Sequence, residues 1–369
     1  MQRVINPRTR RQETLTSPLR RGSPRRTIKC ICFVAGAALV ASMVAQGIAV
    51  RRHPLRPDAL IAPSEQFSNS RLFELLDRDD FKFLAVMAFL VSPTGSNQTY
   101  TSDPTWNNSN NSIETIGAGG SGGAAGSSGF ERASGAGGGA WNKTTNFNFP
   151  SPGSSTTTYQ IGTGGAGIAA TTASVPGNNG GDTWFGGTTL GTSSVGSKGG
   201  SGGLAPQSNT NTAGGAGGVG ANGVGSSHND GGAGGACNAQ LSSSGGGGAG
   251  GSHGAGNAGA IATGGAASAG GSGDAGSGGA GGTAGNSNNA GTGGTGTEYD
   301  STHGSGGGGG GNLGDGPLGN GGNYGGGSGA DMFGATTAAT ASGGSGLIVL
   351  TWTPVVLPPG YPGFTHCEW

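Results

Sequence analysis

The residues that could do chemistry in this sequence are few and widely spaced. Two G-x-S-x-G stretches, Gly119–Gly123 and Gly199–Gly203, have the residue pattern of a serine nucleophile on a sharp turn. That turn joins a strand to a helix, and neither stretch is flanked by sequence that would form both. Glycine is also so frequent that the pattern arises by chance. We therefore expect neither serine to act as a catalytic nucleophile.

The acidic and histidine side chains also lack the spacing of a catalytic or metal site. Glu298, Asp300 and His303 are close together in GTEYDSTH, which predicts a polar turn or, as the alternative, an exposed contact loop. Asp274 lies in GGSGDAG, which has one aspartate where calcium-binding nonapeptides need a tandem series. No cysteine and histidine spacing is typical of zinc. We expect no enzyme activity, no metal and no cofactor.

Aromatic side chains are the residues that we expect to bind a partner. A rigid ring gives a large contact area at a small entropic cost, as in antibody loops. The predicted receptor contacts are Tyr299, Tyr324 and Phe333. In our interpretation three further rings pack locally, because glycine supplies no core; these are Trp141, Trp184 and Phe185.

The elements that must position these side chains are dominated by glycine. The chain has 369 residues, and 88 of them are glycine, against a usual share of roughly 7%. Residues 1–86 hold 15 of the 18 basic side chains and three of the glycines, whereas residues 87–369 hold 85 glycines and a net charge of −8. Two segments of different physical type are therefore joined near residue 90.

The N-terminal segment differs from the rest in charge and hydrophobicity. Residues 1–29 are arginine-rich without interleaved aromatics, so we expect a disordered leader that binds no nucleic acid. Residues 30–50 carry no charge and predict one apolar helix, either a membrane span or a signal. Residues 51–91 predict a linker and then a helix over 71–91. Because the composition changes abruptly near Met87, we hypothesise that 1–86 are not part of the native product.

Residues 92–354 are predicted to form one glycine-rich domain, followed by a proline-rich tail over 355–369. We expect residues 113–116 to pair with residues 347–352 and so to close the glycine-rich middle. Residues 141–161 predict a hairpin that turns near Pro150. These expectations rest on short β-branched, aliphatic and aromatic runs at 99–101, 112–116, 156–161 and 346–353.

Glycine recurs at every third position in parts of the middle, as at 270–285. Only five prolines lie between Gly117 and Gly346, which disfavours a collagen triple helix. In a polyproline-II-type helix this spacing leaves one face bare, so that neighbouring backbones can approach and exchange hydrogen bonds. The predicted fold class is mostly irregular and β: a polyglycine-II-type sandwich closed by short strands. A flexible coil is the alternative.

Several stretches resemble the glycine-rich domain proteins of bacteriophages and prophages. The resemblance covers about residues 92–354 and implies stacked polyglycine-II helices at the tip of a tail fibre, with variable loops that meet the host. The partners that it implies are a host cell-surface receptor or glycan and other virion tail proteins. The similar stretches lie at 105–123, 138–149, 156–167, 180–190, 296–311 and 343–354.

Two functions follow from these observations. The first is a phage-type virion structural protein or receptor-binding adhesin, located in the virion tail. The second is a bacterial cell-surface protein that residues 30–50 anchor in a membrane. Translation of residues 1–86 favours the second, and a start at Met87 favours the first.

Overall fold

The computed structural model describes residues 85–125, 133–168, 174–205, 211–238, 242–285, 289–313, 319–331 and 341–355. All of them belong to one compact unit, Gln66–Trp369. The expected basic leader, the expected apolar helix at 30–50 and most of the proline-rich tail lie outside the described residues. Among the residues that are described, no helix is long and apolar enough to cross a membrane.

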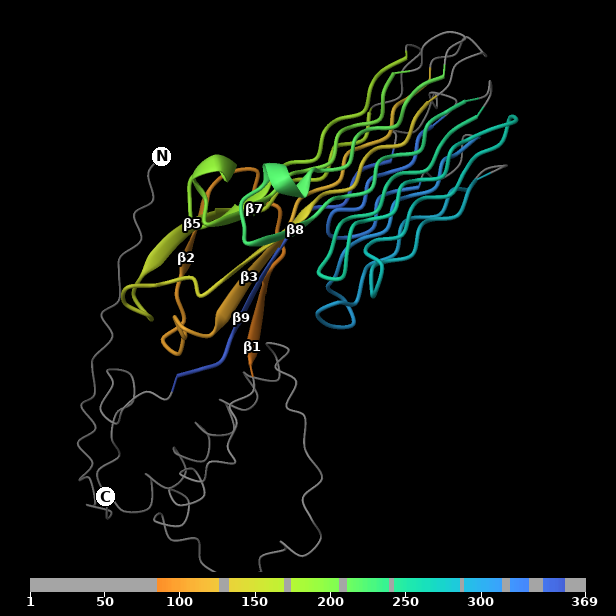
Figure 1. Cartoon of the computed structure of the whole chain (residues 1–369). Helices are drawn as coiled ribbons and strands as arrows, with labels where there is room; N and C mark the ends of the chain where they lie inside the picture. The colour runs from red at the N-terminus through yellow and green to blue at the C-terminus, as the bar shows by residue number, and fades with distance from the viewer. Residues whose placement is uncertain are drawn as a thin grey trace, which may run out of the picture. The chain divides into compact units, whose positions relative to one another are not determined.

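Five strands form an antiparallel sheet in the order β1-β9-β3-β4-β8 (Figure 1). Strand β3 (Asn111–Ile116) pairs with β9 (Leu347–Trp352), which confirms the pairing predicted from their apolar runs. Strand β1 (Val86–Leu90) pairs with the other side of β9. Strands β4 (Trp141–Thr145) and β8 (Ser227–Asn229) complete the sheet.

Strand β1 shows that the helix predicted over 71–91 is wrong where the structure describes it. Alternate residues of β1 pack on opposite faces of the sheet, Val86, Ala88 and Leu90 on one and Met87 and Phe89 on the other. A strand that is packed on both faces is continuously apolar, so its sequence cannot be told from a buried helix by periodicity. The sheet that carries the glycine-rich part therefore begins at Val86 and not at residue 92.

A second antiparallel sheet has the strand order β2-β5-β6-β7. Strand β2 (Gln98–Thr101) pairs with β5 (Thr156–Gln160), and β6 (Thr183–Phe185) pairs with β5 and β7 (Val195–Ser197). The hairpin predicted near Pro150 is therefore wrong, because β4 and β5 belong to different sheets. Two short 3-10 turns, η2 (Leu190–Thr192) and η3 (Gly220–Asn222), follow β6 and precede β8.

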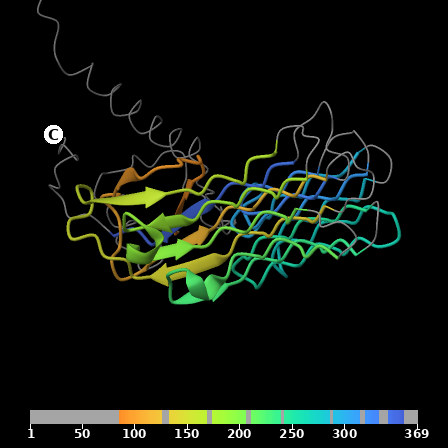
Figure 2. The same cartoon turned by 90° about the horizontal axis from the view of Figure 1, so that it is seen from above.

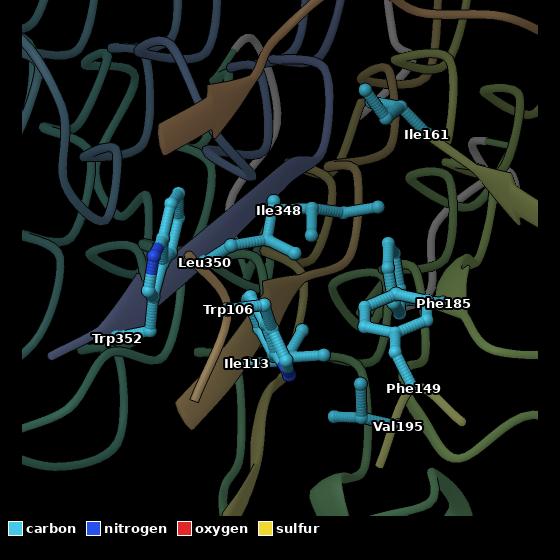
Figure 3. Close-up of a cluster of buried hydrophobic side chains, with 9 residues drawn as sticks. All are labelled: Trp106, Ile113, Phe149, Ile161, Phe185, Val195, Ile348, Leu350 and Trp352. Atoms are coloured by element: carbon cyan, nitrogen blue, oxygen red, sulfur yellow. The ribbon is translucent and has the colours of Figure 1, made fainter. Parts of the chain in front are cut away.

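The space between the two sheets is filled by a small aromatic and aliphatic core (Figure 3). Trp106 is buried there at 1% exposure, and its indole N–H donates to the carbonyl of Phe147 at 3.1 Å. Phe149 lies in the connection between β4 and β5 and points into this core, which explains why the chain crosses there. The other members are Ile113, Ile161, Phe185, Val195, Ile348, Leu350 and Trp352.

Long glycine-rich segments leave the sheets, run side by side and return (Figures 1 and 2). Their backbones hydrogen-bond to one another with a period of three, most clearly in the run Gly306–Gly311. The N–H groups of this run donate to three neighbouring segments in turn, so that residues three apart share a neighbour. The acceptors, in order, are the carbonyls of Tyr324, Gly294, Gly271, Gly327, Gly291 and Ser268.

The carbonyls of the same run accept from three further segments. The donors to Gly306, Gly307 and Gly308 are the N–H groups of Ala249, Gly322 and Gly282. Every glycine from 306 to 311 is buried, and a Cβ added to any of them would meet a carbonyl oxygen well inside the 3.0 Å that real Cβ atoms keep. The backbone itself is therefore the packed material in the centre, and no side chain has room there.

Outer segments show the same period in their burial. Gly279, Gly282 and Gly285 are buried, whereas Ala280 and Thr283 are exposed. The glycine spacing seen in the sequence thus marks the positions that face a neighbouring backbone. Of the remaining positions, Ala280 and Thr283 turn outward, whereas a Cβ at Gly281 would meet the carbonyl of Gly270 in a neighbouring segment.

Candidate functional site

The turn at Glu298–Gly304 carries one of the predicted receptor contacts, Tyr299. The carboxylate of Asp300 closes this turn, because its Oδ1 accepts the N–H groups of Thr302 at 2.7 Å and His303 at 2.8 Å. Its Oδ2 lies 2.7 Å from Nδ1 of His303. Burial acts to raise the pKa of Asp300, but the hydrogen bonds from Thr302 and His303 outweigh it and hold this pKa below its usual range.

Tyr299 is anchored to the first sheet by its hydroxyl group. The hydroxyl donates to Oε2 of Glu114 at 2.8 Å, and the indole N–H of Trp141 donates to the same oxygen at 3.1 Å. Lys143 Nζ lies 2.9 Å from Oε1 of Glu114, so both oxygens of this buried carboxylate are satisfied. Burial, and then the charge of Glu114, raise the pKa of Tyr299 well above its usual value. The phenol therefore stays protonated and serves as a donor.

A stack of three rings holds the turn against the sheet edge and includes the second predicted contact, Tyr324. The ring centroids of His303 and Phe89 are 3.9 Å apart, and their planes differ by 7°. The ring centroids of His303 and Tyr324 are 5.5 Å apart, and their planes differ by 23°. Tyr324 has φ of 65°, which is rare for a residue with a side chain, and Gly325 follows at 94°. Burial and the nearby Asp300 raise the pKa of Tyr324. Its ring remains half-buried, so part of it faces solvent.

The structure thus places Tyr299 and Tyr324 in one group of rings, in which Tyr324 stacks on His303 and Tyr299 meets the edge of Phe89. Phe333, the third predicted contact, lies outside the described residues. Asp331, the last described residue before it, bridges to Ala124 and Asn312, where glycine-rich segments end away from the sheets (Figure 1). A receptor role for the three residues stays a prediction.

The structure also describes the three rings that the sequence predicts to pack locally. Trp141 and Phe185 are buried, at 4% and 0% exposure, as the packing interpretation expects. Trp184 is half-buried, and its indole N–H donates to the amide oxygen of Asn97 at 3.2 Å.

A second polar cluster lies beside the turn and was not found from the sequence. The side chain of Asp274 is wholly buried, and its Oδ1 accepts the N–H groups of Gly276, Ser277 and Gly278 at 3.2, 3.2 and 2.9 Å. Its Oδ2 accepts the N–H of His253 at 2.8 Å and lies 3.3 Å from that imidazole.

Glu298 faces Asp274 across this cluster. A Cβ added to Gly251 would lie 2.5 Å from Oδ2 of Asp274 and 2.7 Å from Oε1 of Glu298, so both carboxylates crowd the same point. Ser305 links them, because its N–H and hydroxyl donate to Glu298 while its hydroxyl accepts the N–H of Asp274. Burial, together with the charge of Asp274, raises the pKa of Glu298. No local spacing indicates this contact, because Asp274 in GGSGDAG and Glu298 in GTEYDSTH belong to separate parts of the sequence.

Within the described ranges, no three His, Cys, Asp or Glu side chains are placed to ligate a metal ion. No protein-family model matches this chain, and no curated protein matches it.

The opposite end of the glycine-rich segments is the other candidate surface. Several glycine-rich segments end near one another there. They flank the connections at 126–132, 169–173, 239–241, 286–288, 314–318 and 332–340. Isolated bridges join their ends: Ala124 with Val175 and Asp331, Ala133 with Ser243, Cys237 with Ala262, and Asn312 with Gly285 and Asp331.

Proposed function

We propose that this chain is a phage-type virion structural protein or receptor-binding adhesin, whose glycine-rich segments form a polyglycine-II scaffold. The observation that carries the proposal is the period-three hydrogen bonding of Gly306–Gly311 to six neighbouring segments. A helix with three residues per turn points successive N–H groups in three directions, which is this pattern. Such packing needs no side-chain core, so it can support many connections of unrelated sequence.

The arrangement of the segment ends favours a binding role over a purely structural one. Connections between packed segments tolerate sequence change, and binding residues are commonly placed on such connections over a rigid scaffold. Several connections start and finish close together here. Their sequences include large side chains that are scarce elsewhere in the glycine-rich part, such as Phe130, Arg132 and Phe333.

The test is adhesion of the fluorescently labelled full chain to a panel of bacterial strains. We expect saturable binding to a subset of strains, and weaker binding after Phe333→Ala or Tyr324→Ala. Thr292→Ala is the matched control, because Thr292 is exposed on the side of the scaffold and should bind as the unchanged protein does. Equal binding by all three variants would remove these residues from the receptor contact.

The location of the native protein distinguishes the cell-surface alternative from the phage proposal. Residues 30–50 carry no charge, and a protein anchored by them would be recovered in the membrane fraction with residues 1–86 intact. A virion protein would be recovered in purified particles. Recovery only from membranes, with a mass that includes residues 1–86, would contradict the phage proposal.

A further inference from the structure

Three outer glycine-rich segments, 211–219, 230–238 and 254–262, lie side by side. Backbone hydrogen bonds join the first to the second, as from the N–H of Gly234 to the carbonyl of Gly215 at 2.8 Å. Other bonds join the second to the third, as from Gly259 to Ala233 at 2.9 Å. The three segments therefore form one continuous layer at the surface of the scaffold.

In the first two segments two of every three positions face other backbones. A Cβ added to Gly214 in the first segment would meet the carbonyl of Gly234 in the second segment. A Cβ added to Gly215 would meet the carbonyl of Gly202, which lies behind the layer. In the second segment, a Cβ added to Gly232 would likewise meet the carbonyl of Asn257, and one added to Gly231 would meet the carbonyl of Gly138. Only the remaining third of the positions can carry a side chain outward.

The third segment meets a backbone at only one position in three, and Asn257 and Ala260 are exposed. The Cβ direction at Gly256 meets the carbonyl of Gly248 behind the layer. The side chain of Asn257 turns sideways instead, because its Nδ2 donates to the hydroxyl of Ser272 in the next segment at 2.7 Å. The outward positions of the three segments form a set that we call the alanine face: Ala213, Ala216, Val219, Asp230, Ala233, Ala236, Ala255, Ala258 and Ile261.

The alanine face is apolar and open to solvent. All its members are exposed except Ala236, which is half-buried. Asp230, at one end of the middle segment, is its one charged residue. Val219 and Ile261 are 42% and 54% exposed, and Leu204, in the bordering segment, is 47% exposed. Scattered exposed apolar residues are ordinary, whereas a contiguous apolar patch of a few hundred Å² is often functional.

The far side of the scaffold has the opposite character. The segments there are joined through hydrogen bonds from Gly343 to Gly165, from Gly321 to Ser342 and from Gly293 to Asn320. Their exposed outward positions hold hydroxyl and amide side chains, with Ala166 as the exception: Thr163, Asn320, Asn323, Thr292 and Ser342. The same backbone lattice therefore displays methyl groups on one side and polar groups on the other. The backbone alone does not impose this difference.

We propose that the alanine face is a contact surface between two copies of this chain, related by a two-fold axis. Its side chains repeat every three residues, or about 9 Å along each segment, with bare glycine backbone between them. A second copy has the same spacing, so its methyl groups fit into those gaps. The near absence of charge lets two identical faces meet without repulsion.

The size of the face sets the strength of the contact. Nine residues at about 3.1 Å each give a length of about 28 Å, and three backbones about 4.8 Å apart give a width of about 14 Å. Each copy thus contributes about 400 Å², and the pair buries about 800 Å², below the ~1,200 Å² of stable interfaces. The dimer is therefore weak in solution and forms where copies are held close together, because tethering raises their effective concentration.

The test is sedimentation of the full chain over a range of concentrations from about 1 µM to about 1 mM, which spans the affinity expected of weak contacts. We expect monomer at the low end and dimer at the high end. Ala216→Glu and Ala233→Glu place a charge in the centre of the face and should weaken the dimer by about tenfold or more. Thr292→Glu, on the polar side, is the matched control and should leave the association unchanged.

The contrary results are equally clear. A chain that stays monomeric at the highest concentration overturns the proposal, as does a loss of dimer in Thr292→Glu equal to that in Ala216→Glu. Far-ultraviolet circular dichroism and the unfolding midpoint show whether each variant is folded. Should Ala216→Glu fail to fold, Ala233→Glu decides the question by the same measurement. Binding of the wild-type monomer to lipid vesicles without any self-association would assign the face to a different partner.

Discussion

Replacing Gly308 by alanine should destabilise this protein strongly, although it adds only one methyl group. That methyl would overlap the carbonyl oxygen of Gly246, which accepts the N–H of Gly271 at 2.9 Å. Gly308 itself donates to the carbonyl of Gly271 at 2.7 Å. All the atoms around the new methyl belong to backbones, so no rotamer change can make room for it.

The magnitude follows from three contributions. Overpacking a close-packed interior costs roughly 1–3 kcal/mol, and weakening two buried hydrogen bonds costs about 1 kcal/mol each. The smaller backbone freedom of alanine in the unfolded chain returns about 0.4–1 kcal/mol. The free energy of unfolding should therefore fall by about 3 kcal/mol, a large part of a typical total of roughly 5–15 kcal/mol.

The assay is urea unfolding of the wild type and the variant, with Gly191→Ala as the matched control. A Cβ at Gly191 has no atom within 4 Å, so the same substitution there should be neutral or slightly stabilising. A loss of less than about 1 kcal/mol in Gly308→Ala, or equal effects in both variants, would refute the close packing of backbones and favour a loose glycine-rich coil.

Three other predictions concern the turn at 298–304. Because the pKa of Glu298 is raised on folding, its contribution to stability is present below the usual glutamate pKa and is lost as the pH rises through the folded value. Glu298→Gln should therefore flatten the pH dependence of urea unfolding above the usual glutamate pKa; an unchanged profile would contradict this. Tyr299→Phe removes the donor to Glu114 and should cost about 1–3 kcal/mol, and a neutral effect on the unfolding midpoint would show that the bond does not anchor the turn. The pKa of Asp300 is lowered, so the contribution of Asp300 to stability is present above the usual aspartate pKa and is lost in acid. Since the Asp300 side chain is 40% exposed, Asp300→Asn should lower the free energy of unfolding by less than about 1 kcal/mol at pH 7 and not at all at pH 2. A loss of stability that persists at pH 2 would contradict the charge-based reason.

The sequence predicted the strand pairing that closes the domain but not every strand. The run at β9 is mostly aliphatic, the run at β3 has β-branched Ile113, Thr115 and Ile116, and no glycine interrupts either, so their pairing could be predicted. Strand β1 could not, because VMAFL is apolar on both faces and follows a segment with helical spacing. The hairpin near Pro150 was wrong for a different reason. Phe149 enters the core between the sheets, and such a long-range contact leaves no local signal.

The glycine pattern was more informative than it first appeared. Spacing of three predicted which faces of the outer segments are buried. The run Gly306–Gly311 interrupts that spacing, yet it occupies a position with neighbours all around it. A segment in the interior needs glycine at every position, whereas an outer segment needs it only toward its neighbours. The glycine run and the spacing of three therefore have the same cause, which is the close approach of neighbouring backbones.

The candidate site was only partly accessible from the sequence. Rings at Tyr299 and Tyr324 stand out in a glycine-rich sequence, and the polar turn was predicted from GTEYDSTH. The partners that determine what these rings do are remote, since Glu114 lies 185 residues before Tyr299. Hydrogen bonds of that kind depend on the tertiary fold, and no local spacing indicates them.

The pairing of Ile116 with Leu347 has a consequence for how this protein can change. The chain leaves β3 at Ile116, comes back to the same sheet in β4 and β8, and enters β9 at Leu347. Paired residues on neighbouring strands are only about 5 Å apart. Everything between them is topologically an insertion between two adjacent strands. A pair of segments, one outgoing and one returning, can therefore be added or removed without moving the point of entry or exit. The glycine-rich part is modular in length, whereas the strands β4 to β8 that interrupt it belong to the two sheets.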